Sequence, residues 1–416
     1  MNITIIGGGA AGFMAAVTAA EKFPNAAITI IEKNKTVLNK VRVSGGGRCN
    51  VTNDPTDLRF FVKNYPRGEK FLRQLFNQFN AQDTVDWFTK NGVTLKTEAD
   101  GRMFPTSNTS QTIIEFFIRI TRALNINVRT SISISTFAVV SKNKEPYFLL
   151  KSEQGETFEA DRVLIATGGH PKSSGYEWLQ NHLFEINSPI PSLFTFNTPT
   201  NNLIKLAGVS IPDAIVKIVG TKLEYRGPLL ITHWGFSGPA VLKLSAWGAK
   251  YLHEKNYEFT SKVNWVPELS EDEVREQLML QRQNNSKQQI ASHSRFEIPN
   301  RLWKEFTTNA EIPDTLRWNE ASNKHLNRLV ELLTNSQFEV KGKTTFKEEF
   351  VTCGGVALNE INPVTLESKR IPGLFFAGEL LDVDGITGGF NFQNAWTTGY
   401  VVGTHIGKPI SIPTQP

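Results

Sequence analysis

Three glycines near the start of the chain have the spacing that binds a dinucleotide. They are Gly7, Gly9 and Gly12, in the pattern G-x-G-x-x-G, and an acid, Glu32, follows 20 residues after the last of them. In such a turn the first glycine allows a tight bend, the second lets the backbone approach a pyrophosphate, and the third lets helix and strand pack closely. Glu32 is expected to accept hydrogen bonds from the adenosine ribose hydroxyls, and its carboxylate would repel a 2′-phosphate. The sequence therefore predicts a dinucleotide site.

A second glycine-rich segment, Ser44-Gly-Gly-Gly-Arg-Cys-Asn50, comes soon after this motif. We expect its backbone N–H groups and the Arg48 guanidinium to contact an anion or a flat ring. A flexible turn is the alternative. Further along, Arg102 stands between Gly101 and a Phe-Pro pair. It is predicted either to clamp a substrate or phosphate or to be a salt-bridged loop arginine.

Glycines also mark the later part of the chain. Ala166-Thr-Gly-Gly169 follows an apolar strand-like run, Gly373–Glu379 is again strand-like, and Gly388-Gly-Phe-Asn-Phe392 opens a final helix. A second glycine-flanked helix start, far from the first in sequence, suits the other end of a long cofactor. FAD has such an end, because its isoalloxazine reaches well beyond its adenosine. A helix N-terminus at the N1/C2=O edge would stabilise the anionic reduced ring.

The elements around the first motif favour a real dinucleotide fold over a chance glycine turn. Asn2–Ile6 and Ala27–Ile31 read as buried strands and Phe13–Lys22 as a helix, all within a unit of roughly 30 residues. Asp161–Ile165 is another buried strand, which returns the chain to the nucleotide crevice. Phe71–Lys90 is predicted to be helical, with apolar residues on one face.

From about Ser192 the pattern changes to short alternating segments, which predict a β-rich domain. Ser270 and Glu273 form a capping-box pattern that opens a polar helix. Leu326–Leu333 is predicted to be an amphipathic helix, and Thr345–Thr352 a strand that leads back to the first domain.

Composition is that of an ordinary globular protein of two or three domains. The chain has 416 residues, of which 40% are hydrophobic and 20% charged. Its two cysteines, Cys49 and Cys353, do not make a disulfide framework, which favours a reducing compartment. Met1 leads straight into the first strand and no apolar run approaches the length of a membrane helix. We expect a cytoplasmic protein without a membrane partner.

The charge balance is basic, with a net charge of +5 and a pI of about 9.0. Much of the excess lies in Lys33–Arg73, which holds ten Lys and Arg against three acids. Charge alone favours a solvated face with a few charges serving the cofactor phosphates, and a surface for a polyanion such as RNA is the alternative.

The chain resembles the BaiN-like or YhiN-like bacterial FAD-dependent flavoproteins, within the two-dinucleotide-binding flavoprotein group. The matching segments span most of the sequence: Gly7–Gly12, Lys40 with Ser44–Asn53, Gly101–Ser107, Ala166–Gly169, Thr232–Pro239, Gly354–Lys369 and Gly373–Trp396. Two positions depart from the family pattern. The segment His170–Tyr176 is shorter than usual, and Leu38 replaces a glycine.

The resemblance implies an α/β fold in which a Rossmann-like FAD-binding domain is split by an inserted β-barrel-like domain with a helical subdomain. The expected limits are 1–190 with 345–416 for the FAD domain, 191–265 for the β-rich insertion and 266–344 for the helices. By the same resemblance, Gly378 and Glu379 lie along the ribityl chain and Gly389–Phe392 beside the flavin. The expected FAD contacts are Gly7, Gly9, Ala10, Ala11, Gly12, Glu32, Lys33, Lys40, Ser44, Gly45, Gly46, Gly47, Arg48, Cys49, Asn50, Ala166, Thr167, Gly168, Gly169, Gly378, Glu379, Gly388, Gly389, Phe390, Asn391 and Phe392. No metal site is expected.

Members of the resembled family are linked to three activities. They reduce uridine in ribosomal RNA to dihydrouridine, reduce an enone in bile-acid breakdown, or oxidise aminoacetone with oxygen. The first two share hydride transfer from flavin N5 to a conjugated C=C, and we favour this class with ribosomal RNA as the substrate. NAD(P)H is the expected transient electron donor, since only one G-x-G-x-x-G unit is present. An amine oxidase and a non-catalytic RNA-binding flavoprotein are the alternatives.

Such a reduction also requires an acid that protonates the α-carbon. A thiol of unperturbed pKa about 8.5 qualifies, so Cys49 is the first candidate, with a small buried filler as its alternative. Arg102 is the second catalytic candidate. Cys353, His170 and His233 rank behind Cys49 as proton donors.

Overall fold

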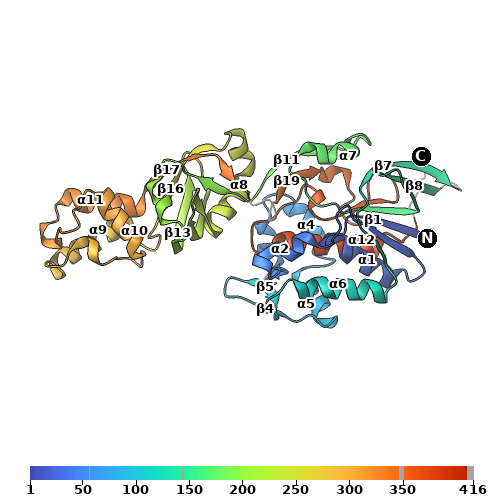
Figure 1. Ribbon diagram of the computed structural model, residues 1–416, viewed down its shortest axis with the longest axis horizontal. Coiled ribbons are helices and arrows are strands. Elements are labelled where there is room, and N and C mark those ends of the chain that lie inside the picture. Colours follow the sequence, from blue (N-terminus) through green and yellow to red (C-terminus); the bar gives the residue numbers. More distant parts are fainter. Residues whose placement is uncertain (56, 143–144, 346–350, 410–416) are drawn as a thin grey trace. The chain divides into compact units, whose positions relative to one another are not determined.

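The computed structural model describes residues 1–55, 57–142, 145–345 and 351–409. The chain divides into two compact units (Figure 1). Unit 1 combines Met1–Ser192 with Lys347–Pro416, and unit 2 is the intervening Leu193–Phe346.

A five-stranded parallel sheet forms the centre of unit 1. Its order is β20-β10-β1-β2-β6, and each neighbouring pair runs parallel. The strands are β1 (Asn2–Ile6), β2 (Ala27–Ile31), β6 (Asn127–Arg129), β10 (Arg162–Ile165) and β20 (Leu374–Phe376). The apolar side chains of β1 and β10 are buried on both faces, as is usual for a parallel sheet covered on both sides. The carboxyl ends of all five strands lie at one edge of this sheet.

Two helices from opposite ends of the sequence pack against each other in unit 1. They are α1 (Ala10–Lys22) and α12 (Phe390–His405), and both can be followed beside β1 in Figure 1. Their approach depends on small residues: a Cβ on Gly399 would lie 2.5 Å from the Ala11 carbonyl oxygen, and one on Gly403 would lie 2.7 Å from that of Ala15. The two helix axes can therefore come closer than larger side chains would permit.

The remaining elements of unit 1 are short and surround this centre. Three small antiparallel sheets have the orders β3-β5-β4, β7-β8-β9 and β11-β19. Their strands are β3 (Thr52–Asn53), β4 (Leu95–Thr97), β5 (Arg102–Pro105), β7 (Ile134–Lys142), β8 (Glu145–Ser152), β9 (Thr157–Ala160), β11 (Ile186–Pro191) and β19 (Thr352–Val356). The helices are α2 (Asn39–Gly47), α3 (Leu58–Phe61), α4 (Glu69–Leu75), α5 (Ala81–Lys90), α6 (Gln111–Ala123) and α7 (Glu177–Gln180).

Unit 2 is built on a seven-stranded antiparallel sheet of order β17-β16-β13-β14-β15-β12-β18. The two outermost strands, β17 (Ser336–Lys341) and β18 (Lys343–Thr344), are separated only by Gly342. Because consecutive residues connect its two edges, the sheet must curl back on itself like a barrel. The other strands are β12 (Thr195–Asn197), β13 (Ser210–Ile218), β14 (Glu224–Ile231), β15 (Gly235–Ser237) and β16 (Glu258–Asn264).

Helices of unit 2 share one hydrophobic core with this sheet. Strand residues such as Val216 and Val263 belong to the same buried cluster as Trp303 and Leu329, which lie on helices. The helices are α8 (Pro239–Glu254), α9 (Glu271–Asn284), α10 (Asn300–Asn309) and α11 (Asn323–Thr334). In Figure 1, α9, α10 and α11 group together beyond β13, β16 and β17. The expected boundary between 265 and 266 therefore does not separate two cores.

The predicted fold class, a Rossmann-like domain split by a barrel-like insertion with helices, is confirmed. One predicted helix is wrong in detail. Phe71–Lys90 forms two helices, α4 and α5, because the Asn80 side chain accepts hydrogen bonds from Gln82 N and Asp83 N and so starts a new helix. The predicted strand Thr345–Thr352 lies mostly outside the described residues. Among the helices that the structure describes, none combines the length and apolarity needed to span a bilayer.

Candidate functional site

The glycine turn after β1 has the conformation that its motif predicts. Gly7 has φ +116°, and a Cβ on it would lie 2.3 Å from the Ala166 carbonyl oxygen. A Cβ on Gly12 would lie 2.1 Å from the Gly7 carbonyl oxygen, so α1 can approach β1 only with glycine there. Gly9 differs, because no atom lies within 4 Å of the Cβ position. The first and third glycines thus serve close packing, and the second faces open space where a ligand backbone can approach.

Glu32 stands at the end of β2 and holds this turn. Its Oε2 accepts a hydrogen bond from Gly8 N at 2.8 Å, while Oε1 accepts from Asn34 N at 2.8 Å and from Asn34 Nδ2 at 2.6 Å. An ionised carboxylate offers about four lone-pair positions. One position on Oε2 therefore remains in the described structure for a ribose hydroxyl. Lys33, next in sequence, is exposed.

The same sheet edge carries the segments that follow β10 and β20. Ala166–Gly169 continues from β10, and Gly378 follows β20. A Cβ on Gly378 would lie 3.0 Å from the Ala11 Cβ, and Gly378 N donates a hydrogen bond to Thr398 Oγ1 at 2.9 Å. The fold thus brings the ends of three strands together with the start of α1 and the middle of α12. This is the crevice in which open parallel sheets bind ligands.

Glu379 ties the neighbouring segments to this edge. It pairs with Lys40 Nζ at 2.5 Å and accepts from Thr352 N at 2.8 Å. Thr352 Oγ1 is buried and, among the described residues, has no hydrogen-bond partner. A Cβ on Gly169 would lie 2.4 Å from that oxygen. Gly169 therefore packs closely against Thr352 and Glu379, and a larger residue would not fit there.

The Ser44–Asn50 segment is not a regular helix, although α2 extends through Gly47. Gly45, Gly46 and Gly47 all have positive φ, and the Cβ positions of Gly46 and Gly47 have no atom within 4 Å. These two backbones face open space, and their contact with a ligand stays a prediction. Arg48 differs from the prediction, because its guanidinium lies 3.9 Å from the centroid of the Phe104 ring and pairs with Glu98 at 2.6 Å. Its flat-ring contact is with the protein itself.

The end of this segment is fastened to the start of α12. With its amide oxygen turned toward Gly389, Asn50 accepts from Gly389 N at 2.9 Å. Asn53 Nδ2 donates to the Gly388 carbonyl at 2.8 Å, and Trp396 Nε1 donates to the Val51 carbonyl at 2.9 Å. Two predicted cofactor segments that lie more than 300 residues apart are thereby joined. Only Asn50 among these polar side chains is an expected contact; no local pattern marks the others.

The α12 start itself is held by its own side chains. Asn391 accepts from Gly385 N at 2.8 Å and donates to the Gly385 carbonyl at 2.9 Å. Phe390 is buried, and its carbonyl accepts from Tyr65 Oη at 2.7 Å. Phe392 stacks on Trp396 with ring centroids 5.8 Å apart. Asn391 and Phe392 therefore shape the loop and the helix face, rather than extending free side chains.

Both helix starts have unused hydrogen-bond donors. Gly9 and Gly389 are the N-cap residues of α1 and α12, and within the described chain no side chain caps either helix. The first N–H groups of a helix lack intrahelical acceptors and carry a partial positive charge. A pyrophosphate at α1 and the electron-rich edge of a flavin at α12 would satisfy them. Together with the open glycine backbones, these donors fit FAD.

Cys49 has the environment of a structural thiol. Its side chain is completely buried, and burial raises its pKa to about 12, with a hydrogen bond to Ser44 acting in the opposite direction. The catalytic assignment depends on a thiol of ordinary pKa that can reach the substrate, and this environment removes both conditions. Cys49 matches the alternative, a small buried filler. Cys353 is buried as well.

Arg102 also matches the alternative that its sequence context leaves open. It pairs with Asp100 at 2.7 Å and with Glu98 at 3.3 Å, so Glu98 bridges Arg48 and Arg102. Its guanidinium lies 5.5 Å from the Phe104 ring. The charges of this cluster are largely neutralised within the protein.

An ion pair that the sequence did not predict orders the loop before α12. Arg67 Nε donates to Asp384 Oδ1 at 2.6 Å, and Ser192 Oγ donates to the same carboxylate. The Asp384 side chain is fully buried and that of Arg67 is 11% exposed. The pairing joins residues 317 positions apart, so no local spacing could reveal it.

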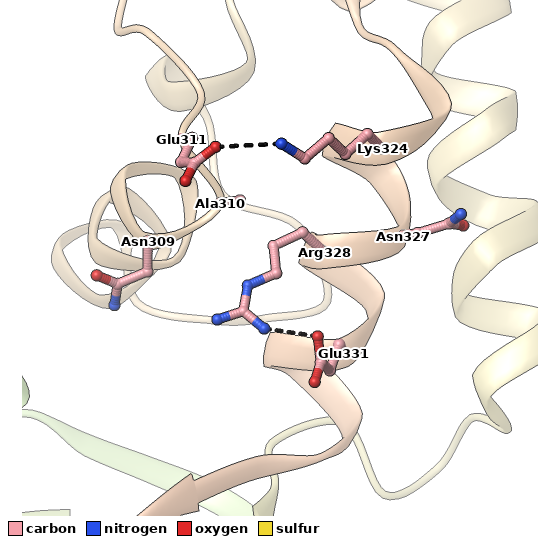
Figure 2. Close-up of a pocket in the computed structure, with 7 residues that line it drawn as sticks. All are labelled: Asn309, Ala310, Glu311, Lys324, Asn327, Arg328 and Glu331. Carbon is pink, nitrogen blue, oxygen red and sulfur yellow. Dashed lines mark hydrogen bonds and ion pairs between the residues drawn. The ribbon is translucent and has the colours of Figure 1, made fainter.

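A separate pocket of about 360 Å³ lies between α10 and α11 in unit 2 (Figure 2). Figure 2 shows two ion pairs along it, Lys324 with Glu311 at 3.5 Å and Arg328 with Glu331 at 2.6 Å. None of the expected cofactor contacts lines this pocket. In the described part of the chain, no group of three or more His, Cys, Asp and Glu is arranged to hold a metal ion.

Comparison with known proteins places this geometry in context. A 3-dehydro-bile acid Δ4,6-reductase of Clostridium scindens is 29% identical over 97% of this chain and 98% of its own length. A ribosomal RNA dihydrouridine synthase of Escherichia coli is 29% identical over 95% of each chain. The corresponding synthase of Haemophilus influenzae is 26% identical over 97% of this chain and 98% of its own.

Solved structures show the same fold at low identity. A 3-ketosteroid Δ1-dehydrogenase of Sterolibacterium denitrificans aligns with a TM-score of 0.53 at 11% identity, covering 97% of this chain and 98% of its own. A 3-ketosteroid Δ4-(5α)-dehydrogenase of Rhodococcus jostii aligns with a TM-score of 0.52 at 12% identity, covering 98% and 96%.

The family model for the HI0933-like protein Rossmann domain matches residues 1–405, which is nearly the whole chain. The expected enzyme class, an FAD-dependent oxidoreductase, is confirmed at the level of the family. The glycine turn of α1, the uncapped start of α12 and this full-length match agree, and the chain belongs to the HI0933-like family of Rossmann-domain proteins.

Proposed function

We propose that this protein is an FAD-dependent reductase that delivers hydride to a conjugated C=C, and that its substrate is uridine in ribosomal RNA. One observation carries the cofactor assignment: two helices with uncapped glycine starts, α1 and α12, pack together and present their N-termini within one unit. Such a pair suits a cofactor with an anionic centre and an electron-rich ring.

The geometry supports a particular set of residues as the ones that would hold FAD. The Gly7–Gly12 turn would contact the pyrophosphate, and the free position on Glu32 Oε2 would accept from the ribose. Gly378 and Glu379 would border the linking chain, and the Gly388–Phe392 start of α12, braced by Asn50, would contact the flavin. When bound, FAD supplies hydride chemistry, with NAD(P)H as the proposed electron donor.

The chain itself would position the cofactor for this reaction and exclude water from the region behind the α12 start. Asn53, Asn391 and the Arg67–Asp384 pair hold the loop around Gly388 through side-chain hydrogen bonds. Buried aromatic rings, including Phe61 and Phe390 at 5.1 Å between centroids, exclude water behind the α12 start. A site fixed in this way loses little free energy to reorganisation when the substrate reacts.

Ribosomal RNA is the substrate that agrees with the charge of the chain. The Escherichia coli and Haemophilus influenzae relatives are named ribosomal RNA dihydrouridine synthases, and Lys33–Arg73 has ten basic residues against three acids. A small enone is the second candidate, since the Clostridium scindens bile-acid reductase aligns equally well at 29% identity. Both candidates require the same transfer to a conjugated double bond.

The test combines flavin chemistry with RNA analysis. Purified protein should be yellow, and anaerobic NADPH or NADH should bleach it rapidly. Ribosomal RNA from a strain lacking the protein should lose dihydrouridine, and the wild-type protein should restore it. Unchanged dihydrouridine together with rapid NAD(P)H bleaching would redirect the assignment to a small enone. A protein that stays colourless with excess FAD would overturn the proposal altogether.

A further inference from the structure

A short element on unit 1 leaves a phenylalanine ring exposed to solvent. Phe60 lies in α3 (Leu58–Phe61) and its exposure is 61%. The next residue, Phe61, is 3% exposed and packs inward. Exposing so large an apolar ring forgoes the stabilisation of burial, and an aromatic ring beside charged groups suits a ligand that offers a flat face.

Basic residues flank Phe60 in sequence, and we name Arg59, Phe60 and Lys63 the Phe60 surface. Lys63 Nζ lies 5.3 Å from the centroid of the Phe60 ring. The Arg59 side chain is 82% exposed and pairs with Asp57 through hydrogen bonds of 2.6 to 3.1 Å. Across Asp57–Arg73 there are five basic residues and two acids. The three arginines pair with Asp57, Asp384 and Glu69, so the excess positive charge that favours an anionic ligand comes from Lys63 and Lys70.

The Phe60 surface lies close to the proposed flavin end of the cofactor site. Phe61 contacts Phe390, the first residue of α12, with ring centroids 5.1 Å apart. Tyr65 Oη, in the turn that follows, donates to the Phe390 carbonyl at 2.7 Å. One helical turn thus has its inner side against the α12 start and its outer side in solvent. A ligand on Phe60 is separated from that start by little more than this turn.

The chemistry of the surface discriminates between substrates. An enclosed apolar pocket is what a steroid or another small enone would require, whereas Phe60 is open and flanked by charge. Bases of single-stranded nucleic acid stack on exposed aromatic rings while basic side chains contact the phosphates. A uracil inside a duplex would be inaccessible to a reductase unless it were unstacked.

We propose that the Phe60 surface binds single-stranded ribosomal RNA, with a base next to the reacting uridine stacked on Phe60 and the adjoining phosphates on Lys63 and Arg59. This inference rests on the proposed RNA substrate. It adds that the target lies in an unpaired segment and that the protein grips a neighbouring nucleotide outside the reaction site.

Binding of a labelled single-stranded RNA oligonucleotide to the FAD-loaded protein tests the surface. Phe60→Leu retains apolar bulk without a π face and should weaken binding about ten-fold, while Phe60→Trp should restore it. Lys63→Gln should weaken binding and reduce the slope of log K against log salt by about 0.7, as expected for one lost phosphate contact on a single strand. Arg122→Gln, which removes an exposed cation from α6, is the matched control and should change neither quantity.

The outcomes separate this inference from the proposed function. FAD content and melting temperature should match the wild type in every variant, which excludes misfolding. If Phe60→Leu and Lys63→Gln bind RNA as the wild type does, and restore ribosomal dihydrouridine fully, the surface is wrong while the function stands. If the wild type binds the duplex form of the oligonucleotide as tightly as the single strand, stacking on Phe60 is overturned. A wild type that neither binds RNA nor restores dihydrouridine overturns both proposals.

Discussion

Single residues at this site either bind a ligand or fill space, and the contacts around each side chain distinguish the two. Glu32 is buried but retains one acceptor position, so it both fixes the glycine turn and can contact a ligand. Cys49 is buried with no such opening, and its backbone has φ +61°, a conformation that few non-glycine residues adopt. Residue type made both candidates plausible. Only the packing around each side chain distinguishes a binding group from a filler.

Replacing Cys49 with alanine should leave catalysis intact and alter the alkaline stability. Burial raises the pKa of the folded thiol to about 12, whereas an unperturbed thiol titrates between about 8.5 and 9. A raised pKa contributes stability that is present below the ordinary value and lost as the pH rises above it. Between pH 8 and pH 10 the wild type should lose about 1 kcal/mol more than Cys49→Ala, measured by urea unfolding of the apoprotein.

A turnover measurement on Cys49→Ala tests whether the thiol takes part in catalysis. With FAD bound, the alanine variant is expected to turn over within about two-fold of the wild type, because removing a group that does not react leaves the barrier unchanged. A hundred-fold fall with normal FAD content would return the thiol to the position of general acid.

Replacing Glu32 with glutamine should weaken FAD binding at least ten-fold. The amide has a single acceptor oxygen, so Gly8 N and Asn34 can no longer both be satisfied while the ribose is bound. A lost hydrogen bond to a charged group costs about 1.5–3 kcal/mol. Titration of apoprotein with FAD measures the change. Glu69→Gln, on α4, is the control and should bind FAD normally; equal affinity in both variants would remove Glu32 from the site.

At the scale of elements, the site depends on the contact between α1 and α12. Glycines at 399 and 403 allow that contact, and Gly7, Gly12 and Gly378 complete the close approach of backbone and helix. The helix starts are therefore positioned by packing along the helices as well as by the loops before them.

Enlarging Gly399 to alanine should separate the two helices. The added methyl would meet the Ala11 carbonyl oxygen at 2.5 Å and the Met14 Cβ at 3.0 Å, so the backbone must shift. Overpacking of this kind costs about 1–3 kcal/mol, partly offset by the helix propensity of alanine. We expect a lower melting temperature and a loss of bound FAD. Thr404→Ala, on the same helix, should keep both; a Gly399→Ala protein with full FAD and normal melting would contradict this account.

Local sequence patterns predicted many of the helices and strands, and contacts between residues distant in sequence explain the features that were missed. The strands Asn2–Ile6 and Ala27–Ile31 and the capping box of Ser270 with Glu273 were predicted correctly, since each depends on residues close in sequence. The break before α5 was missed because the apolar face continues across it. The Asn80 side chain makes the break by accepting hydrogen bonds from the backbone N–H groups at the start of α5. The Asn53–Gly388 and Arg67–Asp384 bonds join residues more than 300 positions apart, and spacing contains no trace of them.

For the whole molecule, the main feature is an insertion with its own core. Unit 2 buries a continuous cluster that includes Trp265, Trp303 and Trp318. Its first and last strands, β12 and β18, are paired neighbours, with Thr195 opposite Thr344. The insertion therefore begins and ends at one place in its own sheet, and its fold does not depend on where unit 1 holds those ends.

Residues 193–346 expressed alone should fold cooperatively and remain colourless. The buried cluster and the paired terminal strands are complete within this fragment, and none of the expected FAD contacts belongs to it. Circular dichroism during urea unfolding should show one transition, and added FAD should not change it. A fragment without secondary structure would show that unit 2 requires unit 1.

The contact between α1 and α12 also determines when the cofactor can be captured. Gly389 is synthesised 380 residues after Gly9. Strand β1 likewise gains its second neighbour, β10, only after Arg162–Ile165 has been synthesised. The nascent polypeptide can therefore assemble both helix starts only after Gly389 has been synthesised, and until then the Gly7–Gly12 turn lacks its partner helix α12.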